Sequence, residues 1–156
     1  MSELEKNEGI KILKNNYLGH LAFVSKDRPY VVPITYYYNA TKNTVICYAV
    51  EGHKINAMRK HNNVSLVVEE VESVNNWKSV LVVGVFEELH GVDAKYFLHQ
   101  FAIGVRKVIR KKEKRDLHFI SEFSIELASV GIPIVYQINI LEIIGKQRVP
   151  NAINKS

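Results

Sequence analysis

The sequence predicts a single, mainly β domain, a β-barrel accompanied by two or three helices. The first supporting observation is size, because 156 residues with 47% apolar side chains suffice for one domain with a buried core. The second is a succession of short runs rich in Val, Ile and Tyr, separated by polar turns. The third is that the sequence contains no repeat, low-complexity tract or interdomain linker. A barrel is the most economical architecture for such strands.

Residues 1–16 are predicted to form an amphipathic N-terminal helix. Apolar residues from Leu4 to Leu13 alternate with charged ones, and Asn15 and Asn16 end the pattern.

Three strand-like runs follow the N-terminal segment. Leu18–Ser25 and Pro29–Tyr38 are separated by three polar residues, which suits a hairpin, and Thr44–Val50 returns after a second polar turn. Together these runs predict an antiparallel meander. The single cysteine, Cys47, lies in the third run, which excludes an internal disulfide. We interpret it as a small buried hydrophobe.

The middle of the chain predicts a short helix and two further strands. His53–His61 has apolar residues at helical spacing, and two asparagines follow it. Val64–Val71 alternates between apolar and polar residues, whereas Ser79–Phe86 is almost entirely apolar. A strand of the second kind is covered on both faces, either by a barrel core or by a partner subunit. We therefore expect a dimer.

The last third of the chain predicts one long helix and a terminal strand. Residues 92–112 carry apolar side chains at spacings of three and four, with basic residues in the last two turns. Ile132–Ile144 alternates and is predicted to be a strand, after which residues 146–156 form a C-terminal tail.

The net charge of +5 is a local feature of the chain. The segment Arg106–Arg115 contains seven Lys or Arg and one acid, whereas all other residues together hold fourteen basic and fifteen acidic side chains. Three interpretations are open: a solvated helix end, a nucleic-acid-binding surface, or a cluster that attracts a phosphorylated second substrate. We favour the third, because nucleic-acid surfaces are usually broader and carry interleaved aromatic side chains.

Several classes of protein lack support in the sequence. The six histidines show no metal-ligand spacing, so we expect no metal site. No GxSxG, Walker or GxGxxG motif is present, which argues against hydrolase, P-loop and Rossmann chemistry. The charged N-terminus and the lack of a long apolar run predict a cytoplasmic protein without a membrane span.

Three short blocks instead suit a phosphorylated planar cofactor. Glu51–Lys54 ends a strand and opens a helix, where free N–H groups and a lysine attract phosphate. Pro33 belongs near a sheet edge because it lacks an N–H group. Ser79 places a hydroxyl at the start of an apolar strand. The aromatic residues of these blocks, Tyr36 and Trp77, are more often core or interface residues than stacking platforms.

The order and spacing of five segments resemble one known family. The segments are residues 19–24 (GHLAFV), 29–39 (PYVVPITYYYN), 49–70 (AVEGHKINAMRKHNNVSLVVEE), 76–89 (NWKSVLVVGVFEEL) and 135–146 (VYQINILEIIGK). They resemble the flavin-binding split-barrel proteins of the pyridoxamine 5′-phosphate oxidase-like superfamily, and most closely the nitroimidazole-resistance-related flavin-nucleotide-binding branch.

This resemblance implies a homodimer of six-stranded antiparallel split β-barrels of Greek-key topology, with FMN bound at the subunit interface. The strand that contains Pro33, Ile34, Thr35 and Tyr36 would lie along the isoalloxazine ring. The phosphate would be held by a second group of residues, and Trp77 would help to close the site. The implied phosphate ligands are Gly52, His53, Lys54 and Ser79.

The implied function is that of a flavoprotein oxidoreductase that passes electrons or hydride from NAD(P)H to a small-molecule acceptor. No side chain stands out as a catalytic acid or base. Where many relatives read FHSA, this chain reads ICYA, so Cys47 replaces the histidine tied to nitro-compound reduction. The arginine-rich motif expected for pyridoxine phosphate oxidation is not evident after Gly145. Two alternatives stay open: a non-catalytic flavin, haem or deazaflavin binder, and a nucleic-acid-associated protein.

Overall fold

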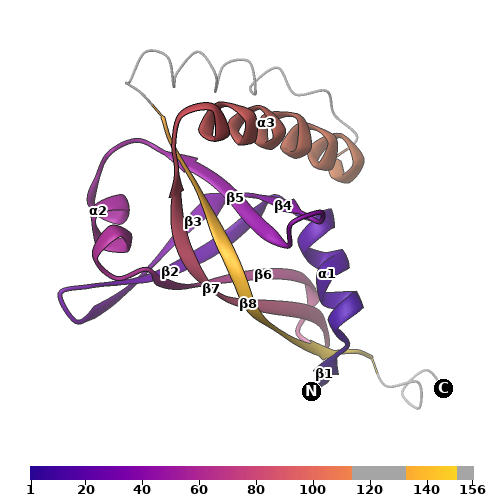
Figure 1. Cartoon of the computed structure of the whole chain (residues 1–156). Coiled ribbons are helices and arrows are strands. Elements are labelled where there is room, and N and C mark those ends of the chain that lie inside the picture. The colour runs from indigo at the N-terminus through magenta and orange to yellow at the C-terminus, as the bar shows by residue number, and fades with distance from the viewer. Residues whose placement is uncertain (114–132, 151–156) are drawn as a thin grey trace.

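The computed structural model describes residues 1–113 and 133–150, which form one curled antiparallel sheet with helices packed around it (Figure 1). The strands are β1 (Ser2–Leu4), β2 (Leu18–Ser25), β3 (Arg28–Thr35), β4 (Tyr37–Asn39), β5 (Thr44–Ala49), β6 (Asn63–Ser73), β7 (Asn76–Leu89) and β8 (Ile134–Arg148). The helices are α1 (Lys6–Asn15), α2 (His53–Lys60) and α3 (Gly91–Glu113). The strand order is β3-β2-β6-β7-β8-β5-β4, and β1 pairs with β8.

The barrel is split between β3 and β4, the two ends of this order. The break falls at Tyr36, between the end of β3 at Thr35 and the start of β4 at Tyr37, although the Tyr36 N–H still donates to the carbonyl of Tyr17 at 2.8 Å, in register with β2. The prediction of one continuous strand over Pro29–Tyr38 is therefore wrong. The split-barrel prediction is confirmed, because six strands have at least six residues, and β1 and β4 add three residues each.

Strand β1 and the last residues of β8 lie side by side at one end of the barrel (Figure 1). The predicted helix begins at Lys6 rather than in the first residues, because Ser2–Leu4 pairs with residues 145–147 of β8. Leu4 is thereby buried over Gly145, where a Cβ would lie only 2.7 Å from the Cβ of Leu4. The predicted C-terminal tail does not begin at residue 146, because β8 continues to Arg148, and residues 151–156 of that tail lie outside the described residues.

Strand β5 is covered on both faces. Val45 and Cys47 face the barrel core, whereas Ile46 packs on the other side against α3. The rings of Tyr48 and Phe101 meet edge to face with centroids 4.9 Å apart. Helix α3 thus adds a second layer over the barrel wall (Figure 1). Its predicted position at residues 92–112 agrees with the observed Gly91–Glu113.

Strand β7 is less completely covered than its sequence predicts. Val80, Val82 and Phe86 are buried in the barrel, but the alternate residues Leu81 and Val83 are only half-buried in the single chain. The partner subunit that we expect on this face stays a prediction. Within the described residues, no helix has the length and apolar character needed to cross a membrane.

Candidate functional site

Helix α2 begins where the sequence predicts a phosphate site. Gly52 is the N-cap residue, is exposed and has no side chain with which to cap the helix. The N–H of Asn56 makes the first helical bond, to the carbonyl of Gly52 at 3.1 Å. The N–H groups of the first turn therefore point outward without intrahelical acceptors, at the positive end of the helix dipole. We call Gly52, His53 and Lys54 the α2 site.

The His53 ring joins α2 to the hairpin of β2 and β3. Its Nε2 lies 3.0 Å from the Ser25 hydroxyl, and its centroid lies 5.1 Å from that of Tyr30. Tyr30 in turn stacks on Phe23 with centroids 5.5 Å apart. Our sequence reasoning missed these neighbours, although a hairpin register that pairs Phe23 with Tyr30 would have found the aromatic pair.

Lys54 is half-buried, unlike a typical surface lysine. Burial lowers its pKa, and the nearby Cys47 acts in the opposite direction. Cys47 itself is 1% exposed, and burial raises its pKa to about 12. The thiol is therefore protonated at neutral pH, and the interpretation of Cys47 as a buried hydrophobe is confirmed.

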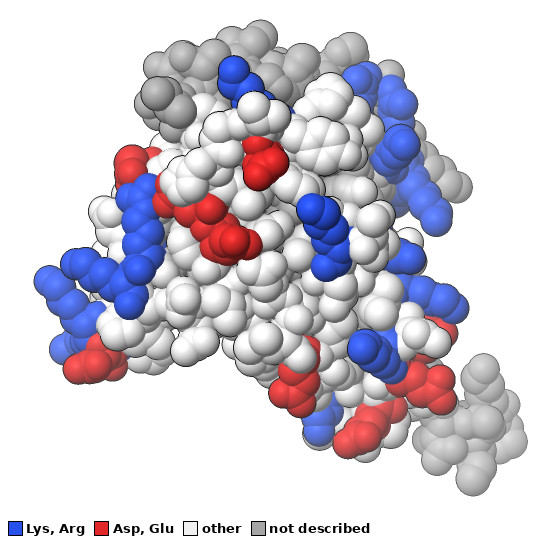
Figure 2. All heavy atoms as spheres, viewed as in Figure 1, with Lys and Arg blue, Asp and Glu red and all other residues white. Residues whose placement is uncertain are grey.

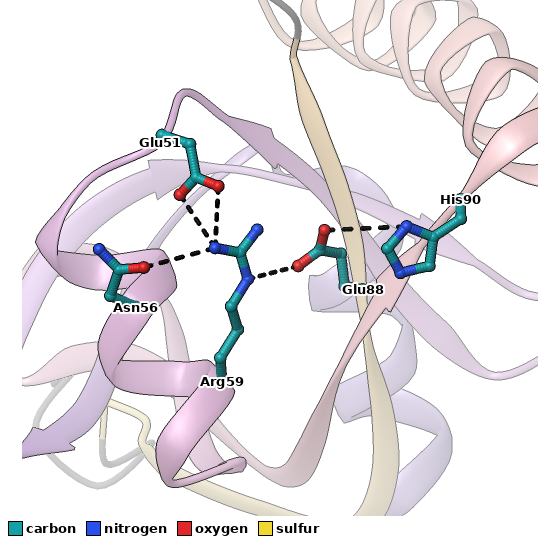
Figure 3. A network of polar contacts seen from close by, with 5 residues as sticks. All are labelled: Glu51, Asn56, Arg59, Glu88 and His90. Atoms are coloured by element: carbon teal, nitrogen blue, oxygen red, sulfur yellow. Dashed lines mark hydrogen bonds and ion pairs between the residues drawn. The ribbon is translucent and has the colours of Figure 1, made fainter.

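A polar network holds α2 against the end of β7 (Figure 3). Arg59 Nη1 lies 2.8 Å from a carboxylate oxygen of Glu51, and Arg59 Nε donates to Glu88 at 2.7 Å. The guanidinium also holds the pKa of Glu88 below its usual range. His90 Nδ1 lies 3.9 Å from the other oxygen of Glu88. The network neutralises Glu51, the acidic residue next to the α2 site.

Strand β3 places its predicted residues on two different faces. Pro33 is exposed on this edge strand, opposite His20 of β2, and Thr35 is half-buried. Ile34 and Tyr36 face the core instead, at 7% and 0% exposure. The Tyr36 hydroxyl donates to the Leu13 carbonyl at 2.9 Å, and burial raises its pKa. Tyr36 is therefore a core residue, whereas Pro33 and Thr35 remain accessible for a ligand at the sheet edge.

Trp77 and Ser79 lie at the opposite end of the sheet from α2. Ser79 pairs with Glu69 of β6, and extending the register between β6 and β2 brings Glu69 level with Leu18. His53, in contrast, contacts Ser25 at the other end of β2. Seven residues of strand separate the two positions by roughly 20 Å. One chain therefore does not bring Ser79 to Lys54, and their shared phosphate stays a prediction.

The family model described as pyridoxamine 5′-phosphate oxidase matches residues 5–131. The chain belongs to this family. A curated relative, the uncharacterized protein RA0666 of Rhizobium meliloti (strain 1021), is 43% identical over 72 residues, or 46% of each protein. The matched part thus spans about half the length of that relative.

Several solved structures share the fold of this chain. An FAD-binding protein of Mesorhizobium loti has a TM-score of 0.72 and 26% identity, over 96% of this chain and 97% of that one. An FAD-binding protein of Mycobacterium smegmatis has a TM-score of 0.60 and 17% identity, over 95% and 98%. A proposed 5-nitroimidazole antibiotic resistance protein of Bacteroides thetaiotaomicron has a TM-score of 0.63 and 17% identity, over 92% and 85%.

The residues of the α2 site and of β3 fit a flavin phosphate and ring. The α2 site offers uncapped N–H groups, an imidazole and a partly desolvated ammonium, all of which are donors suited to a phosphate. Strand β3 offers an unpaired edge whose side chains are largely exposed. Among the described residues, no group of three or more His, Cys, Asp or Glu could hold a metal ion.

Proposed function

We propose that this protein binds a flavin, FMN, and transfers electrons or hydride from a reduced nicotinamide to a small acceptor. One observation carries the proposal: the open edge of β3 leads directly to the α2 site. The strand runs from Arg28, on the α2 side, to Thr35, near the C-terminal end of α1. Its eight residues span roughly 25 Å, enough for a ring and a phosphate-bearing chain laid lengthwise. The FAD-binding relative at 26% identity supports a flavin.

Each group in this arrangement has a physical role. Lys54 and the N–H groups of the first turn of α2 bind the phosphate. His53 also binds it, and the contact of its ring with the Ser25 hydroxyl orients the imidazole. Pro33 has no N–H, and the register with β2 directs the backbone groups of Ile34 toward β2, so the Thr35 backbone groups are the nearest complete donor and acceptor for a heterocycle on the open edge. The flavin, when bound, supplies the redox chemistry, and the protein orients it and shields it from water.

The flavin site is completed, in this proposal, by a second copy of the chain. The half-buried apolar residues Leu81, Val83 and Val85 alternate along one face of β7, which is typical of an interface. A partner that covers this face brings a second Trp77 and Ser79 to the assembly. In such an assembly Ser79 and Lys54 of one chain need not bind the same phosphate, because each can contribute to a site together with residues of the other copy.

The visible absorption spectrum of the purified protein tests the proposal. We expect the native chain to retain FMN after addition and desalting, and Lys54→Ala to lose it. Lys60→Ala is the matched control, because Lys60 is an exposed lysine at the other end of α2. Retention by both variants would contradict the phosphate site, and no retention by the native chain would contradict flavin binding. Oxidation of NADH or NADPH with added acceptors then tests turnover.

A second candidate is a flavin-binding protein without turnover, and the environment of Cys47 favours it. The thiol stands at the position of the family histidine, is 1% exposed and has a pKa of about 12. It therefore cannot serve as an acid or base at neutral pH. This candidate predicts stable flavin binding with no nicotinamide oxidation above that of free FMN.

A further inference from the structure

A cavity of about 480 Å³ opens between the C-terminal ends of α1 and α3, beside β6. Its lining is strongly basic, and basic side chains gather along this edge of the molecule, at the right of Figure 2. We call it the lysine pocket. It is lined by Lys14, Asn15, Glu70, Lys107, Val108, Lys111 and Lys112.

The charges of this pocket are poorly balanced. Four lysines face one carboxylate, so the lining carries a net charge of about +3. Glu70 Oε1 accepts a hydrogen bond from the amide of Asn16 at 3.2 Å. Lys112 donates to the same Asn16 side chain. In the described part of the chain, Lys14, Lys107 and Lys111 have no ion pair. The pocket therefore presents three uncompensated cations.

Helix dipoles do not fully account for this arrangement. The C-terminal ends of helices favour cations within the last turn, which explains Lys14 on α1 and residues 110–112 on α3. Lys107 lies outside the last turn of α3, on the same face as Lys111 and one turn away. Like charges at this spacing destabilise a helix. A bound anion would relieve the repulsion.

We propose that the lysine pocket binds an organic diphosphate, such as the diphosphate of a nucleotide. Three free ammonium groups match the charge of a diphosphate better than that of a single phosphate. The cavity has the volume of a small-molecule site, which a phosphate alone does not fill. Val108 supplies an apolar wall for the organic part. The inference concerns a site distinct from the α2 site and does not depend on flavin binding.

Calorimetric titration of the full-length chain with ADP tests the pocket. We expect one ADP per chain, with AMP binding more weakly and inorganic pyrophosphate competing. Lys14→Gln should weaken ADP binding about tenfold, and the double variant Lys107→Gln/Lys111→Gln by more than about thirtyfold, because each removes a charge-assisted hydrogen bond. The thermal midpoint of each variant checks that it folds.

Two matched controls make the test specific. Lys95→Gln removes an exposed lysine from the first half of α3 and should leave ADP affinity unchanged. Lys54→Gln alters the α2 site and should also leave it unchanged. The proposal is overturned if ADP does not bind at about 1 mM, if Lys95→Gln weakens it as much as the pocket variants, or if Lys54→Gln alone abolishes binding.

Displacement of ADP, together with the same pocket variants, shows whether the diphosphate belongs to a nicotinamide dinucleotide or to a free nucleotide. If the ligand is a nicotinamide dinucleotide, NADPH or NADH displaces ADP, and the pocket variants raise its Michaelis constant while flavin stays bound. If the ligand is a free nucleotide, the dinucleotides do not displace ADP. Duplex DNA that binds with a steep salt dependence and is not displaced by ADP would instead assign the lysines to nucleic acid and overturn the proposal.

Discussion

The α2 site and the lysine pocket are both cationic, yet they differ in the burial of their lysines and in the direction of the helix dipoles that act on them. At the α2 site a single half-buried lysine lies in the first turn of a helix, where the dipole adds positive potential. In the lysine pocket four exposed lysines lie near the C-terminal ends of two helices, where the dipoles subtract from it. The α2 site would attract an anion with a few fixed and partly desolvated donors. The lysine pocket would attract one with the number of its charges.

The acidic neighbours of the two sites differ in the same way. Glu51, beside the α2 site, is neutralised by the guanidinium of Arg59. Glu70, in the lysine pocket, accepts a hydrogen bond from the neutral amide of Asn16, which brings no opposite charge to it. At the α2 site, therefore, the carboxylate of Glu51 does not compete with a bound anion for the cationic groups. Salt should therefore weaken the lysine pocket more than the α2 site, because exposed charges are screened more strongly.

The largest effect is expected from a change that moves α3 alone. A Cβ at Gly104 would lie 2.5 Å from the ring of Tyr37, so Gly104→Val forces the helix off β4. We expect a loss of about 2 kcal/mol of stability, or roughly 6 °C in thermal midpoint. ADP affinity should fall with it, while flavin affinity stays near the native value.

Ile103→Val is the control for this change, because Ile103 is exposed on the same helix. It places a valine one position away, where the native isoleucine is already β-branched and exposed, so no clash arises and the midpoint should match that of the native chain. A Gly104→Val protein with native midpoint and native ADP affinity would show that the pocket does not depend on the packing of α3.

An intermediate effect is expected when the α2 site loses its neutralising group. Arg59→Gln releases Glu51, whose free carboxylate then repels the flavin phosphate. We expect flavin affinity to fall about fivefold, because the network is solvent-exposed and such pairs are weak. ADP affinity should not change. The double variant Arg59→Gln/Glu51→Gln should recover most of the loss in a flavin titration; failure to recover would assign Arg59 a direct role.

Much of the fold follows from local patterns. Strand β2, the start of β3, helix α3 and the start of α2 were all predicted within one or two residues, because strand alternation, helical spacing and a glycine before a helix are local signals. The break at Tyr36 was not predictable in this way. At this position the Tyr36 side chain is buried and its hydroxyl donates to the carbonyl of Leu13 in α1, a tertiary contact that a local pattern does not report.

The sites show the same division between local and distant information. The α2 site is contiguous in sequence, so its residues were predicted together, and their role in phosphate binding stays a prediction. The lysine pocket joins Lys14 to Lys107, which are 93 residues apart, and the basic run near the end of α3 gave no sign of Lys14. Ser79 was grouped with Lys54 by resemblance, and the single chain separates them.

The smallest effect concerns the cost of keeping Lys54 half-buried. Its pKa in the folded protein is lower than that of an exposed lysine, because burial disfavours the charged form. Below the folded pKa the ammonium is charged in both the folded and unfolded states, and the full cost of its burial is present. That cost disappears as the pH rises from the folded pKa to about 10.4, where the unfolded lysine also loses its proton.

Lys54→Met should therefore stabilise the protein without flavin by roughly 2 °C at pH 7, and the gain should vanish near pH 10.5. Thermal melts at both pH values measure it, with Lys60→Met and Lys111→Met as exposed controls that change the midpoint by less than about 1 °C. In the presence of FMN the order should reverse, because only the native chain gains stability from the bound phosphate. A Lys54→Met protein that melts lower than the native chain at pH 7 without flavin would mean that the ammonium stabilises the fold. In that case Lys54 would be retained for the stability of the fold, and its burial would no longer indicate a phosphate site that differs from the lysine pocket.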